Sequence, residues 1–190
     1  MYVSNSFGMR SLREYSFEIP QGITRIAVFG DSFTECVDVR NEEAWPYLIE
    51  KSCENYEVLN FGVRAYGTDQ SLLRYRRDAR IFNPKIVLIG FMIENIRRNV
   101  NRYRPFYEHN TGGLGVKPRF LTKGDSLVLL PNPITSSRKL QKTDGLAEAH
   151  QNHPIIYGHF TPKGNLLIKN ILLSWMKQMR ILTPESSIKD

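Results

Sequence analysis

The stretch that decides the fold runs from residue 25 to residue 33 and reads Arg25-Ile26-Ala27-Val28-Phe29-Gly30-Asp31-Ser32-Phe33. Its first part is an apolar run of strand length, and a helix-like pattern follows the glycine turn. A strand that ends in such a turn places the next side chains at the carboxyl edge of a sheet. The N–H groups that open the following helix have no partners inside it and carry partial positive charge. A serine there presents its hydroxyl among donors suited to an oxyanion.

Two roles are open for the residues after Gly30. Asp31 or Ser32 could cap the helix, as aspartate and serine often do. Alternatively, Ser32 is a nucleophile that the turn exposes. The turn by itself does not distinguish a cap from a catalytic serine, so the rest of the chain has to.

Strand and helix patterns alternate along the chain. We expect strands over residues 56–59 and 86–93 and helices over residues 42–52, 68–82 and 162–179. Short apolar strands separated by helices indicate an α/β fold with a parallel sheet covered on both faces. In the last helix the spacing predicts an inward stripe of Ile168, Ile171, Leu172, Trp175 and Met179.

Three polar or glycine positions fall at or just beyond the carboxyl ends of the predicted strands. They are Ser32, Gly62 and Asn95. Ligands of open parallel sheets bind at this edge, so the sequence predicts a site there. Plainer roles are a turn glycine for Gly62 and a strand or helix terminator for Asn95.

Residues 101–158 have a different character, because prolines and glycines interrupt any long helix. Residues 117–120 and 125–130 could form a hairpin, or residues 126–130 could be a fourth parallel strand. We favour the hairpin. A parallel strand over residues 126–130 would need a crossover connection, usually a helix, and the intervening segment has no helix pattern. We therefore expect one domain over residues 1–190 with an irregular insertion at about 101–158.

Four segments together resemble the sequence blocks of the SGNH hydrolases, also called GDSL esterases. In chain order they are Gly30-Asp31-Ser32, Asn60-Phe61-Gly62-Val63, Glu94-Asn95 and His159-Phe160-Thr161-Pro162-Lys163-Gly164-Asn165. The resemblance covers roughly residues 5–180. It implies a three-layer α/β/α doubly wound parallel sheet of flavodoxin-like type. With a hairpin at 117–130, the chain is shortened by one strand–helix unit that the family has before its histidine.

The resemblance also implies the roles of the site residues. Ser32 is the expected nucleophile and His159 the expected base, while the Gly62 N–H and the Asn95 amide are expected to bind the oxyanion. The implied activity is that of a serine ester hydrolase acting on a small ester or an acylated carbohydrate, with acetyl as the expected acyl group. The alternatives are an O-acyltransferase and a weakly active or inactive accessory protein of polysaccharide modification.

The chain departs from the family pattern beside its histidine. The family carries an aspartate two or three residues earlier, whereas Tyr157 and Ile156 stand at those positions here. The third block also lacks its usual aspartate, since Ile96 follows Asn95. His153, which precedes a proline, is the other candidate base, although no helix pattern follows it.

Composition places few further constraints. The net charge of +7 suits either a solvated face or an acidic partner, and we favour the solvated face because no nucleic-acid-binding motif accompanies the arginines. Two cysteines are too few for a disulfide framework or a zinc site, so we expect no metal and no cofactor. No apolar run is long enough to span a bilayer and no signal peptide is visible, so a cytoplasmic location is expected.

Overall fold

The structure is a computed structural model, and it describes residues 1–104, 116–132 and 162–179. Contacts divide the chain into two compact units. Unit 1 takes in residues 1–66, 71–91 and 159–190, and unit 2 takes in residues 67–70 and 92–158. Each unit is described by itself, and the single domain over 1–190 stays a prediction.

Within the described residues, unit 1 is built on a parallel sheet of three strands. These are β1 (Thr24–Phe29), β2 (Tyr56–Asn60) and β3 (Ile86–Ile89), in the spatial order β2-β1-β3. In the register, Val28 of β1 lies opposite Asn60 on one side and Leu88 on the other. The parallel α/β character is confirmed, and the structure places β1 at the centre of the sheet. β3 is shorter than the expected apolar run, because Gly90 and the residues after it leave the sheet.

Helices follow β1 and β2. A four-residue helix, α1 (Ser32–Glu35), comes directly after β1, and a 3-10 turn, η1 (Asn41–Glu43), leads into α2 (Trp45–Ser52). After β2 come α3 (Thr68–Arg74), a π-helical turn η2 (Tyr75–Ala79) and a 3-10 turn η3 (Arg80–Phe82). Asn83, in the left-handed conformation at φ 47°, ends this run before Pro84, as the sequence predicts.

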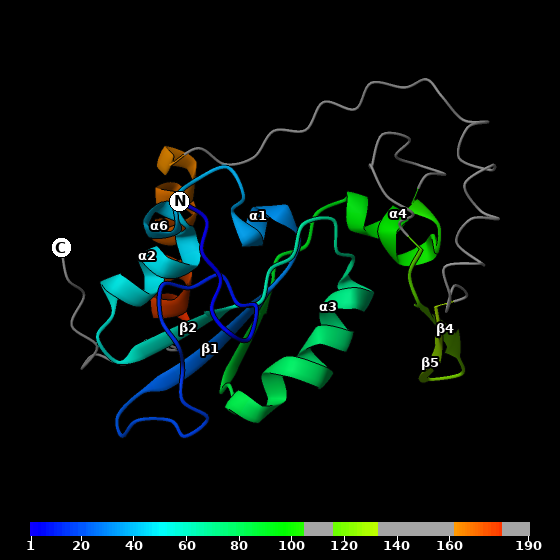
Figure 1. Cartoon of the computed structure of the whole chain (residues 1–190), viewed down its shortest axis with the longest axis horizontal. Helices are drawn as coiled ribbons and strands as arrows, with labels where there is room; N and C mark the ends of the chain where they lie inside the picture. The colour runs from blue at the N-terminus through cyan, green and yellow to red at the C-terminus, as the bar shows by residue number, and fades with distance from the viewer. Residues whose placement is uncertain (105–115, 133–161, 180–190) are drawn as a thin grey trace. The chain divides into compact units, whose positions relative to one another are not determined.

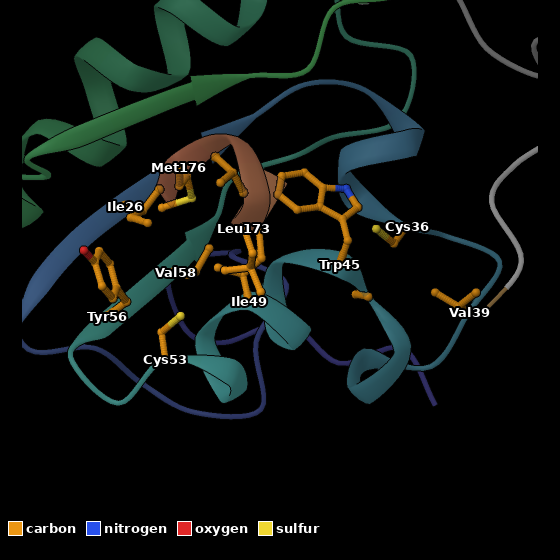
Figure 2. Close-up of a cluster of buried hydrophobic side chains, with 12 residues drawn as sticks. Ile26, Cys36, Val39, Trp45, Ile49, Cys53, Tyr56, Val58, Leu173 and Met176 are labelled. Atoms are coloured by element: carbon orange, nitrogen blue, oxygen red, sulfur yellow. The ribbon is translucent and has the colours of Figure 1, made fainter. Parts of the chain in front are cut away.

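Two apolar clusters cover the two faces of the sheet. Alternate residues of β1 point to opposite faces, so Ile26 and Val28 pack with α2 and α6 (Pro162–Gln178). Ala27 and Phe29 pack on the other face with Ala79 and Phe82. Figure 1 shows α2 and α6 together on one side of β1 and β2, and Figure 2 shows the side chains of the first cluster.

The inward face of α6 differs from the predicted stripe. Leu173 and Met176 are buried, and Ile168 and Leu172 pack partly against the cluster. The predicted Ile171, Trp175 and Met179 are exposed instead. Apolar residues occur on more than one side of this helix, so their spacing alone does not fix its rotation. The buried polar residue Asn165 marks the face that packs inward.

Unit 2 contains a helix and a hairpin. The helix is α4 (Glu94–Val100), and the hairpin joins β4 (Arg119–Lys123) to β5 (Ser126–Leu130) in antiparallel register. The prediction of a hairpin is thereby confirmed, and the alternative, a fourth parallel strand over residues 126–130, is wrong. Residues 105–115 and 133–158 of the predicted insertion lie outside the described residues.

The arginines that follow β2 and β3 do not all lie on solvated faces, so the expectation of a solvated face is wrong for Arg74 and Arg98. Arg74 is buried, donates to the Gly8 carbonyl oxygen at 2.6 Å and lies 5.5 Å from the centre of the Phe61 ring. Arg98 is buried within unit 2. Arg76 and Arg77 are exposed, as expected. Burial lowers the pKa of Arg74, and the nearby Asp78 carboxylate opposes that shift.

Candidate functional site

Ser32 opens α1 directly at the carboxyl end of the central strand. The Asp31 carboxylate caps this helix by accepting a hydrogen bond from the Phe33 N–H at 3.0 Å. The cap is therefore Asp31, which leaves the Ser32 side chain out of that role. Ser32 is partly exposed, and no hydrogen-bond partner of its hydroxyl is found in the described part of the chain. The placement is the one that a nucleophile at this edge needs.

Three glycines, one after each strand, lie against α1. A Cβ on Gly30 would come within 2.2 Å of Thr34 Oγ1, and one on Gly90 within 2.5 Å of the same atom. On Gly62 it would meet backbone, at 2.5 Å from the Glu35 N and 2.7 Å from the Thr34 carbonyl carbon. We call these three residues the glycine cradle. Because no side chain stands between the helix and the strand ends, Ser32 is held close to the sheet edge.

The cradle is closed by backbone and side-chain hydrogen bonds. The Gly90 N–H donates to the Phe29 carbonyl at 2.7 Å, and the Val63 N–H donates to the Gly30 carbonyl at 3.0 Å. The structure thus brings Ser32 and Gly62, two of the predicted site residues, to the same edge of unit 1. The Gly62 N–H itself donates to Asn60 Oδ1 at 2.9 Å.

The other end of α1 is held by a buried arginine. Arg10 donates to the carbonyl oxygens of Glu35, Cys36 and Val39, and its Nε–H donates to Asn41 Oδ1 at 3.0 Å. Carbonyl groups at a helix C-terminus lack hydrogen-bond donors within the helix, and here the Arg10 guanidinium is the donor. Cys36 follows the helix in the left-handed conformation, with φ 58°.

The last helix reaches α1 through one polar side chain. Asn165 is fully buried, and its Oδ1 accepts from the Cys36 thiol at 3.2 Å and from the Trp45 N–H at 3.4 Å. The indole N–H of Trp45 donates in turn to the Phe33 carbonyl oxygen at 3.2 Å. The helix that follows the predicted histidine is therefore connected to the helix that carries Ser32, and both belong to unit 1.

Asn95 belongs to unit 2 and is described within it. It is buried in the first turn of α4, where its Oδ1 accepts from the Met92 N–H at 2.7 Å and its own N–H donates to the Met92 carbonyl at 2.9 Å. These bonds match the plainer terminator role and orient the carboxamide. Its service in an oxyanion hole stays a prediction.

The predicted bases and the positions beside them lie outside the described residues. This holds for His159 and His153, and also for Tyr157 and Ile156, where the family aspartate is missing. Thr161, which we expect to cap α6, falls outside as well, whereas Pro162 is the first residue of α6, as the expected range 162–179 has it.

Sequence reasoning gave no role to three residues that support the site, although two of them, Asn60 and Asn165, stand in the four sequence blocks. Arg10, Asn60 and Asn165 are all polar and buried, and each makes hydrogen bonds to groups distant in the chain. Asn60, at the end of an otherwise apolar strand, was the one with a visible signal. Arg10 occurs in a stretch with no pattern that distinguishes a buried polar residue from a surface one, and the block that ends at Asn165 gave no sign that this side chain is buried.

A cavity of about 260 Å³ lies between the N-terminal segment and α2. Its wall includes Arg10, Tyr15, Tyr47 and Asn60, but not Ser32. It shares Arg10 and Asn60 with the residues that support α1 but does not include Ser32, so it is not the space above the proposed nucleophile. Within the described ranges, no three histidine, cysteine or acidic side chains gather as metal ligands. None of the helices found there has the length and apolar character to cross a membrane.

Comparison with known proteins gives limited matches. No family model matches the sequence, and no curated protein matches it. Among solved structures, a GDSL-like lipase from Bacteroides thetaiotaomicron is similar to this chain at 16% sequence identity. The match covers 87% of this chain and 93% of the lipase chain, with a TM-score of 0.43.

Proposed function

We propose that the chain is a serine ester hydrolase of the SGNH or GDSL type. The observation that carries this proposal is the position of Ser32, which opens a capped helix at the carboxyl end of the central parallel strand, with the glycine cradle around it. The order of the four sequence blocks supports it. The complete three-layer sheet of that family, shortened by one strand–helix unit, is part of the proposal.

The proposed chemistry is acyl transfer through a serine ester. His159 takes the proton of the Ser32 hydroxyl as Oγ bonds to the ester carbonyl carbon. The carbonyl π electrons move to oxygen, giving a tetrahedral oxyanion. When that intermediate collapses, the carbon–alkoxy bond breaks and the alcohol leaves with the proton from His159. Water then attacks the acyl-serine, with His159 again taking and returning a proton, and releases the acid.

The proposed oxyanion donors are the Ser32 N–H, the Gly62 N–H and the Asn95 amide. Loss of one such donor costs about 10²–10³ in turnover in a well-studied protease. Because the Gly62 N–H donates to Asn60 Oδ1, an oxyanion must share or replace that bond. The Ser32 N–H, at the start of α1, is directed by the Asp31 cap that orders the first turn.

The substrate class that we propose is a small ester, with acetyl carried on a carbohydrate as the first choice. A sugar hydroxyl in place of water in the second step would make the same acyl-serine an O-acyltransferase. The missing acid at Tyr157 and Ile156 favours the second candidate function, an accessory protein with little or no turnover. In the serine-protease example, replacing the triad acid by its amide costs about 10⁴ in turnover.

Two measurements test the proposal. A fluorophosphonate probe should label the chain at Ser32, and short aryl esters should be hydrolysed. Both activities should disappear in Ser32→Ala and His159→Ala. Ser16→Ala, at an exposed serine, is the matched control and should behave as the wild type. Loss of activity in His153→Ala but not in His159→Ala would reassign the base. Absence of labelling and hydrolysis across the pH range would favour the accessory role.

A further inference from the structure

We infer that Asn165 is a positioning residue that aligns the base-bearing end of the last helix with Ser32. The inference rests on the proposed function, because it concerns the same serine and histidine. It starts from a contrast within α6, in which the inward face is apolar except for one fully buried carboxamide. A buried amide is costly unless its hydrogen bonds are made, so its contacts show what it holds.

The carboxamide oxygen of Asn165 joins three elements. It accepts from the Cys36 thiol, at the C-cap of α1, and from the N–H of Trp45, the first residue of α2. Since a backbone N–H can only donate, the oxygen rather than the nitrogen of the carboxamide faces Trp45. Figure 2 shows Cys36 and Trp45 in the same cluster as Leu173 and Met176 of α6.

Trp45 provides a second connection between Asn165 and α1, the helix that carries Ser32. Its indole N–H donates to the Phe33 carbonyl, one residue after Ser32, while its backbone N–H donates to Asn165. Displacement of Asn165 would therefore act on α1 through Cys36 and through Trp45. Hydrogen bonds depend on distance and angle, which apolar packing restricts less, so these two contacts bear on where α6 lies along α1.

The chain connection supplies the other half of the argument. Asn165 is in the first turn of α6, which begins at Pro162, and His159 precedes that proline by three residues. Three residues span at most about 10 Å, so only a short segment of chain connects the proposed base to the start of α6. In acid–base catalysis, displacement of a reacting group by about 1 Å can cost about 10²-fold in rate.

The test compares two ways of weakening α6. Asn165→Leu keeps the volume and removes the acceptor, whereas Leu173→Ala removes apolar packing two turns further along the same helix. At a temperature where both are folded, Asn165→Leu should lower kcat about tenfold or more, with KM within about twofold. Leu173→Ala, compared at a similar loss of Tm, should keep kcat within about twofold. The rate of fluorophosphonate labelling should follow kcat in both variants.

Cys36 provides a second pair of variants, which carries the test if Asn165→Leu does not fold. The Cys36 thiol faces Asn165 Oδ1 and also the carbonyl oxygens of Phe33 and Thr34. Cys36→Ser keeps a donor toward these acceptors, and Cys36→Ala removes it, so the double variant with Asn165→Leu isolates the contact with Asn165. We expect kcat to fall in Cys36→Ala and to be largely kept in Cys36→Ser. Adding Cys36→Ala to Asn165→Leu should cost less than the two single losses combined, because both act through one contact.

The outcomes separate the two proposals. A wild type that neither labels nor hydrolyses esters rejects the proposed function, and this inference with it. An active wild type rejects this inference alone if Asn165→Leu keeps its kcat, or if Leu173→Ala loses as much. Equal activities of Cys36→Ser and Cys36→Ala, at either level, would also reject it.

Discussion

The side-chain amide of Asn60 donates to the carbonyl oxygen of Thr34 over 2.9 Å, although 26 residues separate them. The other end of the same carboxamide accepts from the Gly62 N–H. One buried side chain thereby connects the end of β2, the glycine that follows it and the helix of the proposed nucleophile. The three glycines of the cradle therefore belong to one close-packed arrangement, in which the backbone after each strand lies directly against α1.

Substitution of the cradle glycines should separate two kinds of steric conflict. Gly90→Ala should destabilise the fold because its Cβ meets Thr34 Oγ1 at 2.5 Å, while the next neighbour is at an ordinary 3.5 Å. Thr34→Ala removes that oxygen, so Gly90→Ala should cost less free energy of unfolding in the Thr34→Ala background. Gly62→Ala meets backbone and should not be rescued. Urea denaturation of the single and double variants measures this, and equal rescue at both glycines would contradict it.

Arg10→Lys should destabilise the chain by about 2–4 kcal/mol, because several buried carbonyl groups lose their donors at about 1–3 kcal/mol each. Lysine has the charge but not the fork of N–H groups that reaches Glu35, Cys36 and Val39 together. Arg40→Lys, at an exposed arginine, is the control and should leave the unfolding midpoint unchanged. If the two variants have the same midpoint, Arg10 does not hold the end of α1.

Glu57→Leu should cost about 3–5 kcal/mol of unfolding free energy, since it leaves a buried cation without its partner. The Arg25 side chain is 0% exposed, and its Nη2 and Nε lie 2.6 and 2.8 Å from Glu57 Oε2. The double variant Arg25→Met, Glu57→Leu removes both charges and should be more stable than Glu57→Leu alone. Equilibrium unfolding of the three variants gives the answer, and a double variant less stable than Glu57→Leu would contradict it.

Stability should fall in alkaline solution, partly through Cys36. Burial raises the pKa of this thiol from 9.0 to about 12, and the Trp45 backbone and Arg10 oppose the shift. Between these values the unfolded chain has lost a proton that the folded chain retains. The contribution is therefore complete below pH 9 and is lost as pH rises toward 12.

Two measurements check this. The decline in unfolding free energy between pH 9 and pH 12 should be shallower in Cys36→Ala, and a thiol reagent at pH 8 should not modify Cys36 until the chain is unfolded. Burial also raises the pKa of Tyr15, which adds to the decline in both proteins, so the difference between them isolates the thiol. Rapid modification of Cys36 in the folded chain would contradict the prediction.

Much of the fold could be predicted from local pattern. The run before Gly30 predicted a strand, Asn83-Pro84 predicted the end of a helix, and Pro162 predicted the start of another. These features depend on the conformations available to a few neighbouring residues, so the sequence shows them directly. The hairpin, expected over residues 117–130 and found over 119–130, was likewise preferred because the intervening segment shows no helix pattern for a crossover.

By itself, the sequence determined that Ser32 would follow a buried strand and open a helix, since apolar periodicity and turn chemistry are local properties. Only the tertiary structure decided which face of α6 turns inward, why Arg74 is buried, and how Asn165 reaches Cys36 over 129 residues. Those outcomes depend on hydrogen-bond partners that are distant along the chain. A polar residue reveals nothing of such a partner until folding brings the two together.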